Sequence, residues 1–294
     1  MRKIIVLILI IIVSAVYSKS GFNFLKMEHS PVGISTAGTD YLFSPKGQAV
    51  NYNPAVLSLL DGTSFGVSYS SSVEDSYFTS SEINHNPGVG NISVIFNSYG
   101  IDDIDGYYKP SENPQYSFDA KTLVSGIGYG YKWNDNFSFG LSYKLIFEKI
   151  EFDEAWAHSF NGGVVYRDLI EGLVLSTHIS NLGTSTRVED TKENLPFSLN
   201  GGISYSHKIN LVGVNFAVNN RYDFNDEKNF LNLGAEISWQ SSFFLRVGYR
   251  PENEAQILSY GAGFKVYGLS VDYFYSQFDD IGDTQGFSVN YQLF

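Results

Sequence analysis

Large apolar and small polar residues alternate along most of this chain, in a pattern that recurs about fourteen times. In one run Phe139, Leu141 and Tyr143 share one parity, while Gly140 and Ser142 share the other. A period of two predicts β-strands with one apolar face and one polar face. The polar parity carries Gly, Ser and Asn, whereas a sheet wetted by bulk water usually shows Lys and Glu. A barrel in lipid has this arrangement, with apolar groups outward and small polar groups lining the lumen.

A water-soluble sandwich or solenoid is the alternative, because its strands would alternate as well. Such a fold needs a charged outer face. Charged residues make up 17% of this chain, against roughly 25% in an average soluble domain. Most of these charges fall between the predicted strands. We therefore predict an all-β fold, a transmembrane antiparallel β-barrel of about 14 strands over residues 62–294.

The predicted strands and connections give a second test of the barrel. The strands are 63–72, 75–83, 89–99, 118–132, 137–149, 155–167, 171–181, 197–207, 210–222, 229–239, 243–250, 256–266, 267–277 and 285–294. Short and long connections alternate between them, as in bacterial barrels with short periplasmic turns. Gly100–Ser117 and Ile150–Glu154 are among the predicted long loops, and the short connection near Val73–Glu74 breaks the pattern. An even count places both termini on the periplasmic side.

The first residues form a targeting segment. Arg2 and Lys3 precede an apolar run over Ile4–Val13, and small residues follow. The run is too short to span a membrane, which takes roughly 20 apolar residues. We predict a signal peptide over residues 1–18, with cleavage between Ser18 and Ser20. Residues 19–61 alternate only weakly and form a separate N-terminal segment.

Within this N-terminal segment, we predict a short helix near Pro54–Leu60. Pro54 suits the first helical position and Asn53 suits the N-cap.

No catalytic constellation is present in the sequence. The chain has no cysteine, its five histidines lack metal-ligand spacing, and no Gly-x-Ser-x-Gly or phosphate-binding loop occurs. The glycines of Gly126–Gly130 fall within an alternating strand, where they relieve curvature or make room in the lumen. A net charge of −12 excludes a nucleic-acid partner. We expect no enzyme activity, no cofactor and no metal site.

Two smaller features lead to specific expectations. Glu236 and Arg246 fall on the polar parity of adjacent predicted strands joined by a short turn, which predicts an ion pair in the lumen that helps to fix the register. The chain ends on Phe294, which resembles the terminal signal read by the barrel assembly machinery. The outward parity of the last strand includes Leu293, so Phe294 falls on the other face.

Several segments in order resemble the PorV/PorQ family of outer-membrane barrels, which are related to FadL-type fatty-acid channels. They are Phe24-Leu25-Lys26, Gly33–Gly38, Asn53-Pro54-Ala55, Gly140–Lys144, Ile179–Gly183, Leu195-Pro196, Leu233–Glu236 and Leu245–Tyr249. The resemblance implies a fourteen-strand barrel with residues 19–61 folded into the lumen as a plug. It also implies that Asn53, Pro54 and Ala55 form the plug motif.

Three functions follow as expectations. The resemblance implies an outer-membrane protein that supports protein secretion or surface assembly, with a binding rim at Gly100–Ser117 and Leu182–Pro196. Its partners would be outer-membrane lipid, the barrel assembly machinery, and secretion-system proteins with their cargo. The alternative is a FadL-like channel for hydrophobic or small amphipathic solutes. The third is a mainly structural barrel of the envelope.

Overall fold

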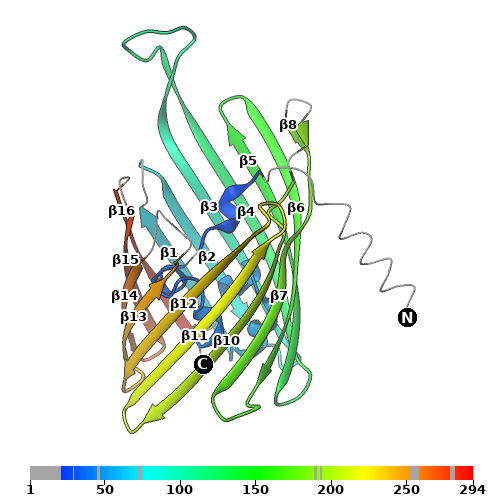
Figure 1. Cartoon of the computed structure of the whole chain (residues 1–294), viewed down its shortest axis with the longest axis vertical. Helices are drawn as coiled ribbons and strands as arrows, with labels where there is room; N and C mark the ends of the chain where they lie inside the picture. Colours follow the sequence, from blue (N-terminus) through cyan, green and yellow to red (C-terminus); the bar gives the residue numbers. More distant parts are fainter. Residues whose placement is uncertain are drawn as a thin grey trace, which may run out of the picture.

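The protein forms a closed antiparallel barrel of fourteen strands (Figure 1), which confirms the predicted fold class. The computed structural model describes residues 21–28, 30–44, 47–71, 75–188, 191–192, 194–251, 258–278 and 282–293. The predicted signal peptide, its cleavage site between Ser18 and Ser20, and the predicted assembly signal Phe294 lie outside these residues. Within them, no helix is both long and apolar enough to cross a membrane.

The strands follow one another around the barrel in chain order. They are β1 Thr63–Ser71, β2 Tyr77–His85, β3 Asn91–Gly106, β4 Tyr116–Lys132, β5 Phe137–Ile150, β6 Asp153–Arg167, β7 Leu173–Ser185, β10 Ser198–Ile209, β11 Val212–Asp223, β12 Lys228–Trp239, β13 Phe243–Tyr249, β14 Leu258–Val266, β15 Leu269–Phe278 and β16 Gly282–Leu293. The barrel closes where β1 pairs with β16, from Thr63 opposite Leu293 to Ser71 opposite Gln285. A separate small hairpin joins β8 Arg187–Val188 to β9 Thr191–Lys192.

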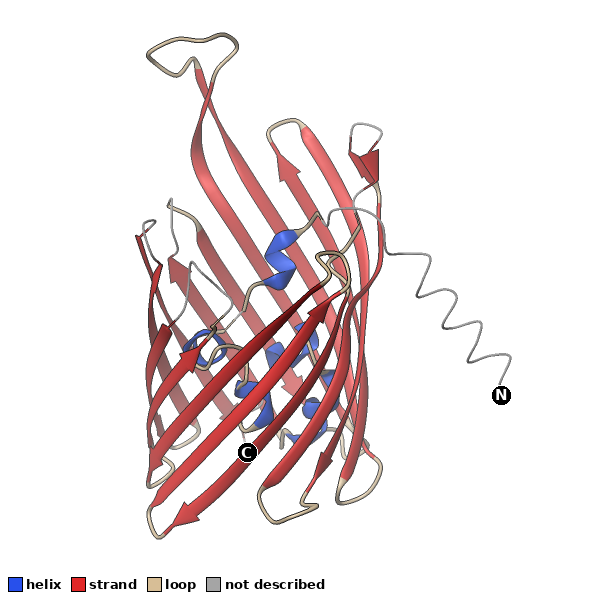
Figure 2. Cartoon of the chain, viewed as in Figure 1, coloured by secondary structure: helices blue, strands red, loops and turns tan. Residues whose placement is uncertain are grey.

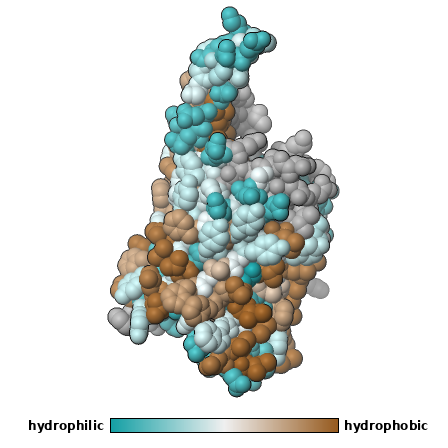
Figure 3. Space-filling view, turned by 90° about the vertical axis from the view of Figure 1, so that its left-hand side faces the viewer, coloured by the Kyte–Doolittle hydropathy of each residue, from teal (hydrophilic) through white to brown (hydrophobic). Residues whose placement is uncertain are grey.

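The two faces of the wall differ as the alternation predicts. Leu141 and Leu245 point outward and are 69% and 67% exposed, whereas their neighbours Ser142 and Arg246 point into the lumen and are 5% and 6% exposed. Apolar groups gather over the lower part of the wall in Figure 3, and the hairpin that rises above it is mostly polar. Large apolar side chains on the outside and small polar ones inside suit a barrel surrounded by hydrocarbon.

The barrel has a turn end and a loop end. The turn end carries the connections at 86–90, 133–136, 168–172, 210–211, 240–242 and 267–268, and the loop end carries the connections between the other consecutive strands. Two predicted long loops are shorter than predicted. β3 and β4 continue through half of Gly100–Ser117, leave a connection at 107–115, and rise above the rest of the barrel (Figure 1). Ile150–Glu154 contains a turn of only two residues, with Glu151 at a φ of 54°. Val73 and Glu74 lie outside the described residues.

Residues 21–28, 30–44 and 47–60, called the plug below, lie inside the barrel (Figure 2). They form five short helices, namely η1 Asn23–Lys26, α2 Pro31–Ser35, η2 Asp40–Leu42, η3 Gly47–Asn51 and η4 Pro54–Leu59. Gly21 N donates to Asn194 O at the loop end over 3.1 Å, and the chain leaves the plug to begin β1 at the turn end. The first strand begins and the last strand ends at the turn end, which agrees with an even strand count. Gly21 lies at the opposite end, so the prediction that both termini lie on one side does not hold for the start of the plug.

Candidate functional site: the plugged lumen

The predicted plug motif begins η4 and fastens it to the barrel wall. Asn53 Oδ1 accepts a hydrogen bond from Ala55 N at 3.0 Å and so caps the helix. Its other amide atom, Nδ2, donates to Ser176 Oγ on β7 at 2.8 Å. Asn53, Pro54 and Ala55 are all buried. One side chain therefore caps the start of η4 and joins that helix to the wall.

Glycines on β4 and β5 make a seat for η4, where its backbone lies close to the wall. A Cβ atom at Gly140 would lie 2.4 Å from Pro54 C and 2.5 Å from Ala55 N. A Cβ atom at Gly130 would lie 2.5 Å from Ser58 N. These neighbours are backbone atoms, so no side-chain rotation could relieve the contact. The sequence predicts that the glycines of β4 leave room in the lumen, and the plug fills that room.

A second seat holds α2 and the turn that follows it. Cβ atoms at Gly248 and Gly261 would lie 2.4 Å from Ala37 N and 2.5 Å from Ser35 Cβ, respectively. Gly248 and Gly261 belong to β13 and β14, nearly opposite β5 in the order of strands around the barrel. The plug thus makes close contacts with the wall on two nearly opposite sides of the barrel.

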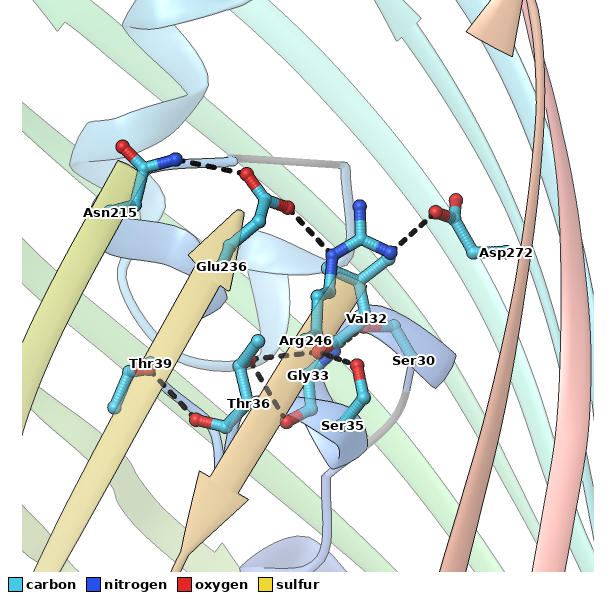
Figure 4. A network of polar contacts seen from close by, with 10 residues as sticks. All are labelled: Ser30, Val32, Gly33, Ser35, Thr36, Thr39, Asn215, Glu236, Arg246 and Asp272. Atoms are coloured by element: carbon cyan, nitrogen blue, oxygen red, sulfur yellow. Dashed lines mark hydrogen bonds and ion pairs between the residues drawn. The ribbon is translucent and has the colours of Figure 1, made fainter. Parts of the chain in front are cut away.

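Arg246 sits at the centre of a buried charge network beside α2 (Figure 4). Its Nε donates to Glu236 Oε2 at 2.7 Å, and its Nη1 donates to Asp272 Oδ1 at 2.7 Å. Asn215 Nδ2 donates to the second oxygen of Glu236 at 2.9 Å. The residues of the predicted lumen pair are direct cross-strand neighbours on β12 and β13.

Asp272 is the member of this network that sequence reasoning missed. It lies on β15, so Arg246 must reach it across β14. Gly263 on β14 allows this reach, because a Cβ atom there would lie 2.3 Å from Asp272 Oδ1 and 2.9 Å from Arg246 Nη1. The inward parity of Asp272 was a signal available in the sequence, but the partner lies two strands away.

A buried lysine joins the plug to the wall at another point. Lys144 on β5 is 1% exposed. Its Nζ donates to Asn181 Oδ1 on β7 at 2.8 Å and to Asn51 O of the plug at 3.3 Å. Asn181 has a φ of 60° and its Nδ2 donates to Pro196 O at 3.2 Å. The lysine therefore links η3, two strands and the connection at the loop end.

A cavity of about 50 Å³ lies between the plug and the wall toward the loop end. Every strand residue that lines it is polar: His178, Ser180, Asn181, Ser198, Asn200, Asn219, Arg221, Asp223 and Asn232. The plug adds the apolar and aromatic residues Leu25, Met27, Tyr41 and Tyr52. It also adds Lys26, whose Nζ lies 3.3 Å from Asp223 Oδ2 and 2.6 Å from Asp226 Oδ2. We call this space the loop-end cavity.

Glu28 of the plug also lines the loop-end cavity. Burial raises the pKa of its carboxyl group, and the nearby charges of Arg250 and Arg221 act in the opposite direction with smaller effect.

A second cavity of about 280 Å³ lies toward the turn end. Its lining includes Leu59 and Leu60 of the plug, Ser64 on β1, Asn84 on β2 and Asn290 on β16. The two cavities share no lining residue. The plug therefore leaves separate cavities toward the two ends of the barrel. Among the described residues, no group of three or more His, Asp or Glu is placed to hold a metal ion.

Comparisons with known proteins give a likeness at the level of fold. A scan against family models and a search of curated protein sequences both found no match. Among solved structures, the monoaromatic hydrocarbon channel CymD matches with a TM-score of 0.63 and 14% identity, over 93% of this chain and 99% of that one. The Pseudomonas putida toluene transporter TodX matches with a TM-score of 0.63 and 12% identity, over 94% and 98% of the chains. A Pseudomonas aeruginosa FadL homologue matches with a TM-score of 0.52 and 11% identity, over 90% and 98%.

These likenesses extend over nearly the whole of each chain, so the barrel is the same kind of structure. At such identities they concern the fold alone. The chemistry of the lumen must therefore be read from the residues of this chain.

Proposed function

We propose that the protein is a solute channel of the outer membrane whose passage is controlled by the plug. The observation that carries the proposal is the plug itself, which rests on glycine seats on two sides of the wall and has a cavity toward each end. A purely structural barrel needs neither seats nor cavities. The outward apolar face supports a membrane location, and the loop end faces the exterior by the usual arrangement of barrel connections.

Support also comes from the solved channels of the same fold. Two of them are described as a hydrocarbon channel and a toluene transporter. The FadL-like reading therefore has more support than a secretion role of the PorV/PorQ type, which rests on the sequence resemblance alone. A secretion role predicts that loss of the protein traps secreted proteins in the periplasm and leaves solute entry unchanged.

Conductance in a planar bilayer tests the proposal. Gly140→Val places side-chain atoms where Pro54 and Ala55 now lie, so we expect η4 to leave its seat and the conductance to rise several-fold. Gly201→Val is the matched control, because Gly201 faces outward on β10 and a Cβ atom there meets nothing within 4 Å. Equal, negligible conductance in the wild type and in a folded Gly140→Val variant with a displaced plug would contradict a channel.

A further inference from the structure

A groove crosses the outer face of the wall where β6, β7, β10 and β11 lie next to one another. Its volume is about 480 Å³, and sites for small molecules in proteins measure roughly 300–1,000 Å³. None of the described residues that line it belongs to the plug or lines either cavity of the lumen. The groove is therefore a separate feature of the surface, and we call it the outer groove.

A row of mostly small side chains forms part of the outer groove. The row crosses four strands, with each residue directly opposite the next: Val164 on β6, Thr177 on β7, Gly201 on β10 and Asn220 on β11. A Cβ atom at Gly201 would meet nothing within 4 Å, so the space outside this residue is open. The neighbouring row, toward the turn end, contains Tyr166, Leu175, Ile203 and Val218. The groove thus lies where bulky side chains give way to a glycine.

The outer groove lies at the depth of the hydrocarbon. Tyr166 is the second residue of β6 counted from the turn end, and Asn220 is the ninth residue of β11 counted from the same end. A strand crosses the hydrocarbon in about 9–11 residues. The groove therefore begins near one boundary of the hydrocarbon and ends near the boundary on the loop-end side. It is continuous with the outward apolar face of the wall, so it opens to lipid rather than to water.

The two polar side chains of the row differ in their partners. Thr177 Oγ1 donates to Asn200 O at 2.9 Å, so the hydroxyl hydrogen is used within the wall. Asn220 is exposed, and its amide makes no hydrogen bond to any other residue that the structure describes. An amide that leaves water without a partner costs free energy. At the edge of the hydrocarbon, the carbonyl oxygens that join acyl chains to a lipid can accept from such an amide.

We propose that the outer groove binds an acyl chain of a membrane lipid from the leaflet at the loop end, and that Asn220 Nδ2 donates a hydrogen bond to the carbonyl group of that chain. The acyl chain supplies the apolar surface that the groove faces. Its carbonyl group lies at the end of the groove where Asn220 needs an acceptor. The outer groove is separate from the plugged lumen, so the inference does not depend on the proposed channel function.

Native mass spectrometry of the folded full chain in detergent micelles tests the inference. The probes are dipalmitoylphosphatidylethanolamine, which has ester carbonyls, and its dihexadecyl ether analogue, which has none. We expect the wild type to bind the ester lipid several-fold more tightly than the ether lipid. Gly201→Leu fills the groove and should weaken the binding of both lipids several-fold. Asn220→Leu leaves the groove apolar and should remove the preference for the ester lipid.

The variants are chosen so that folding does not decide the result. Gly201→Leu places its side chain in open space, and Asn220→Leu makes the lipid-facing surface more apolar. Ser125→Leu is the matched control, because Ser125 is exposed as the eighth residue of β4 counted from the turn end and does not line the groove. It should bind both lipids as the wild type does.

Three results would overturn the proposal. Equal lipid binding by the wild type and Gly201→Leu would show that the groove is not the site. An unchanged preference for the ester lipid in Asn220→Leu would remove the hydrogen bond to the carbonyl group. A wild-type dimer that binds no lipid and that Gly201→Leu dissociates would show that a second copy of the chain occupies the groove.

Discussion

Glu236 and Arg246 face each other across β12 and β13, and Arg246 Nε lies 2.7 Å from Glu236 Oε2. Both side chains are almost completely buried, and the same guanidinium also binds Asp272. Arg246 is thus the cation shared by two buried carboxylates, which ties three strands of the wall together at the level of α2 (Figure 4).

Arg246→Met should destabilise the barrel strongly, because it leaves the carboxylates of Glu236 and Asp272 without their cation. Removal of one partner from a buried ion pair costs about 3–5 kcal/mol. Lys149→Met is the control, since the Lys149–Glu154 pair is about half exposed and should contribute less than about 1 kcal/mol. Urea unfolding in lipid vesicles measures both free energies of unfolding, and equal losses would contradict the shared role of Arg246.

Gly263→Ala tests whether the ion pair needs open space above β14. The added Cβ atom would lie 2.3 Å from Asp272 Oδ1, and overpacking of this kind typically costs about 1–3 kcal/mol. The cost should shrink when Asp272→Ala is already present, because the two residues are in contact and their effects are coupled. A double-mutant cycle measures that coupling, and strictly additive losses would remove Gly263 from the network.

The alternation along the sequence predicts most of the barrel strands but little of the structure of the plug. Leu141 and Ser142 fall on opposite faces because a strand has a period of two, so strand order and parity follow from local residues. The sequence predicts a loop at the loop-end part of β3, because Asp102, Asp103 and Asp105 interrupt the apolar parity there. That part rises beyond the apolar band, so the pattern on which the prediction depends is absent.

Within the candidate site, only contacts between residues close together in the sequence could be predicted. Glu236 and Arg246 are close in sequence, and a short turn determines that they face each other. Asn53 was identified as a helix cap, but its bond to Ser176 joins residues 123 positions apart. The alternation along the strands does not determine which glycine of the wall contacts which residue of the plug. The seats and the loop-end cavity therefore depend on tertiary packing.

The outer face leads to a prediction that distinguishes lipid from water around the barrel. Leu141 is the fifth residue of β5 counted from the turn end and points outward. A strand crosses the hydrocarbon in about 9–11 residues, so Leu141 lies near the midplane and Leu141→Arg should cost about 2–4 kcal/mol in a bilayer. Leu211→Arg, in the two-residue turn before β11, should cost about 0–1 kcal/mol because it lies near the interface. Reversible unfolding from vesicles measures both costs. If Leu141→Arg is tolerated as well as Leu211→Arg, the wall does not face hydrocarbon at that depth.

Glu28 gives the plug a stability that depends on pH. Its pKa is raised above the ordinary value of 4.5, so the folded state holds this proton more tightly than the unfolded chain does. The contribution of Glu28 to stability therefore falls as pH rises from below 4.5 through the raised pKa. Glu28→Gln mimics the protonated form and should reduce this dependence. Unfolding of both proteins at several pH values measures the difference, and parallel pH profiles would contradict the prediction.

The most direct test of the account concerns whether the plug must move for solute to pass. The chain contains no cysteine, so Asn53→Cys with Ser176→Cys introduces a single pair of thiols between η4 and β7. A cleavable bifunctional thiol reagent can then fix the plug to the wall during a single-channel recording. We predict that cross-linking closes the channel and that cleavage of the reagent restores its conductance. Conductance that persists unchanged through both steps would show that solute passes by a route the plug does not control.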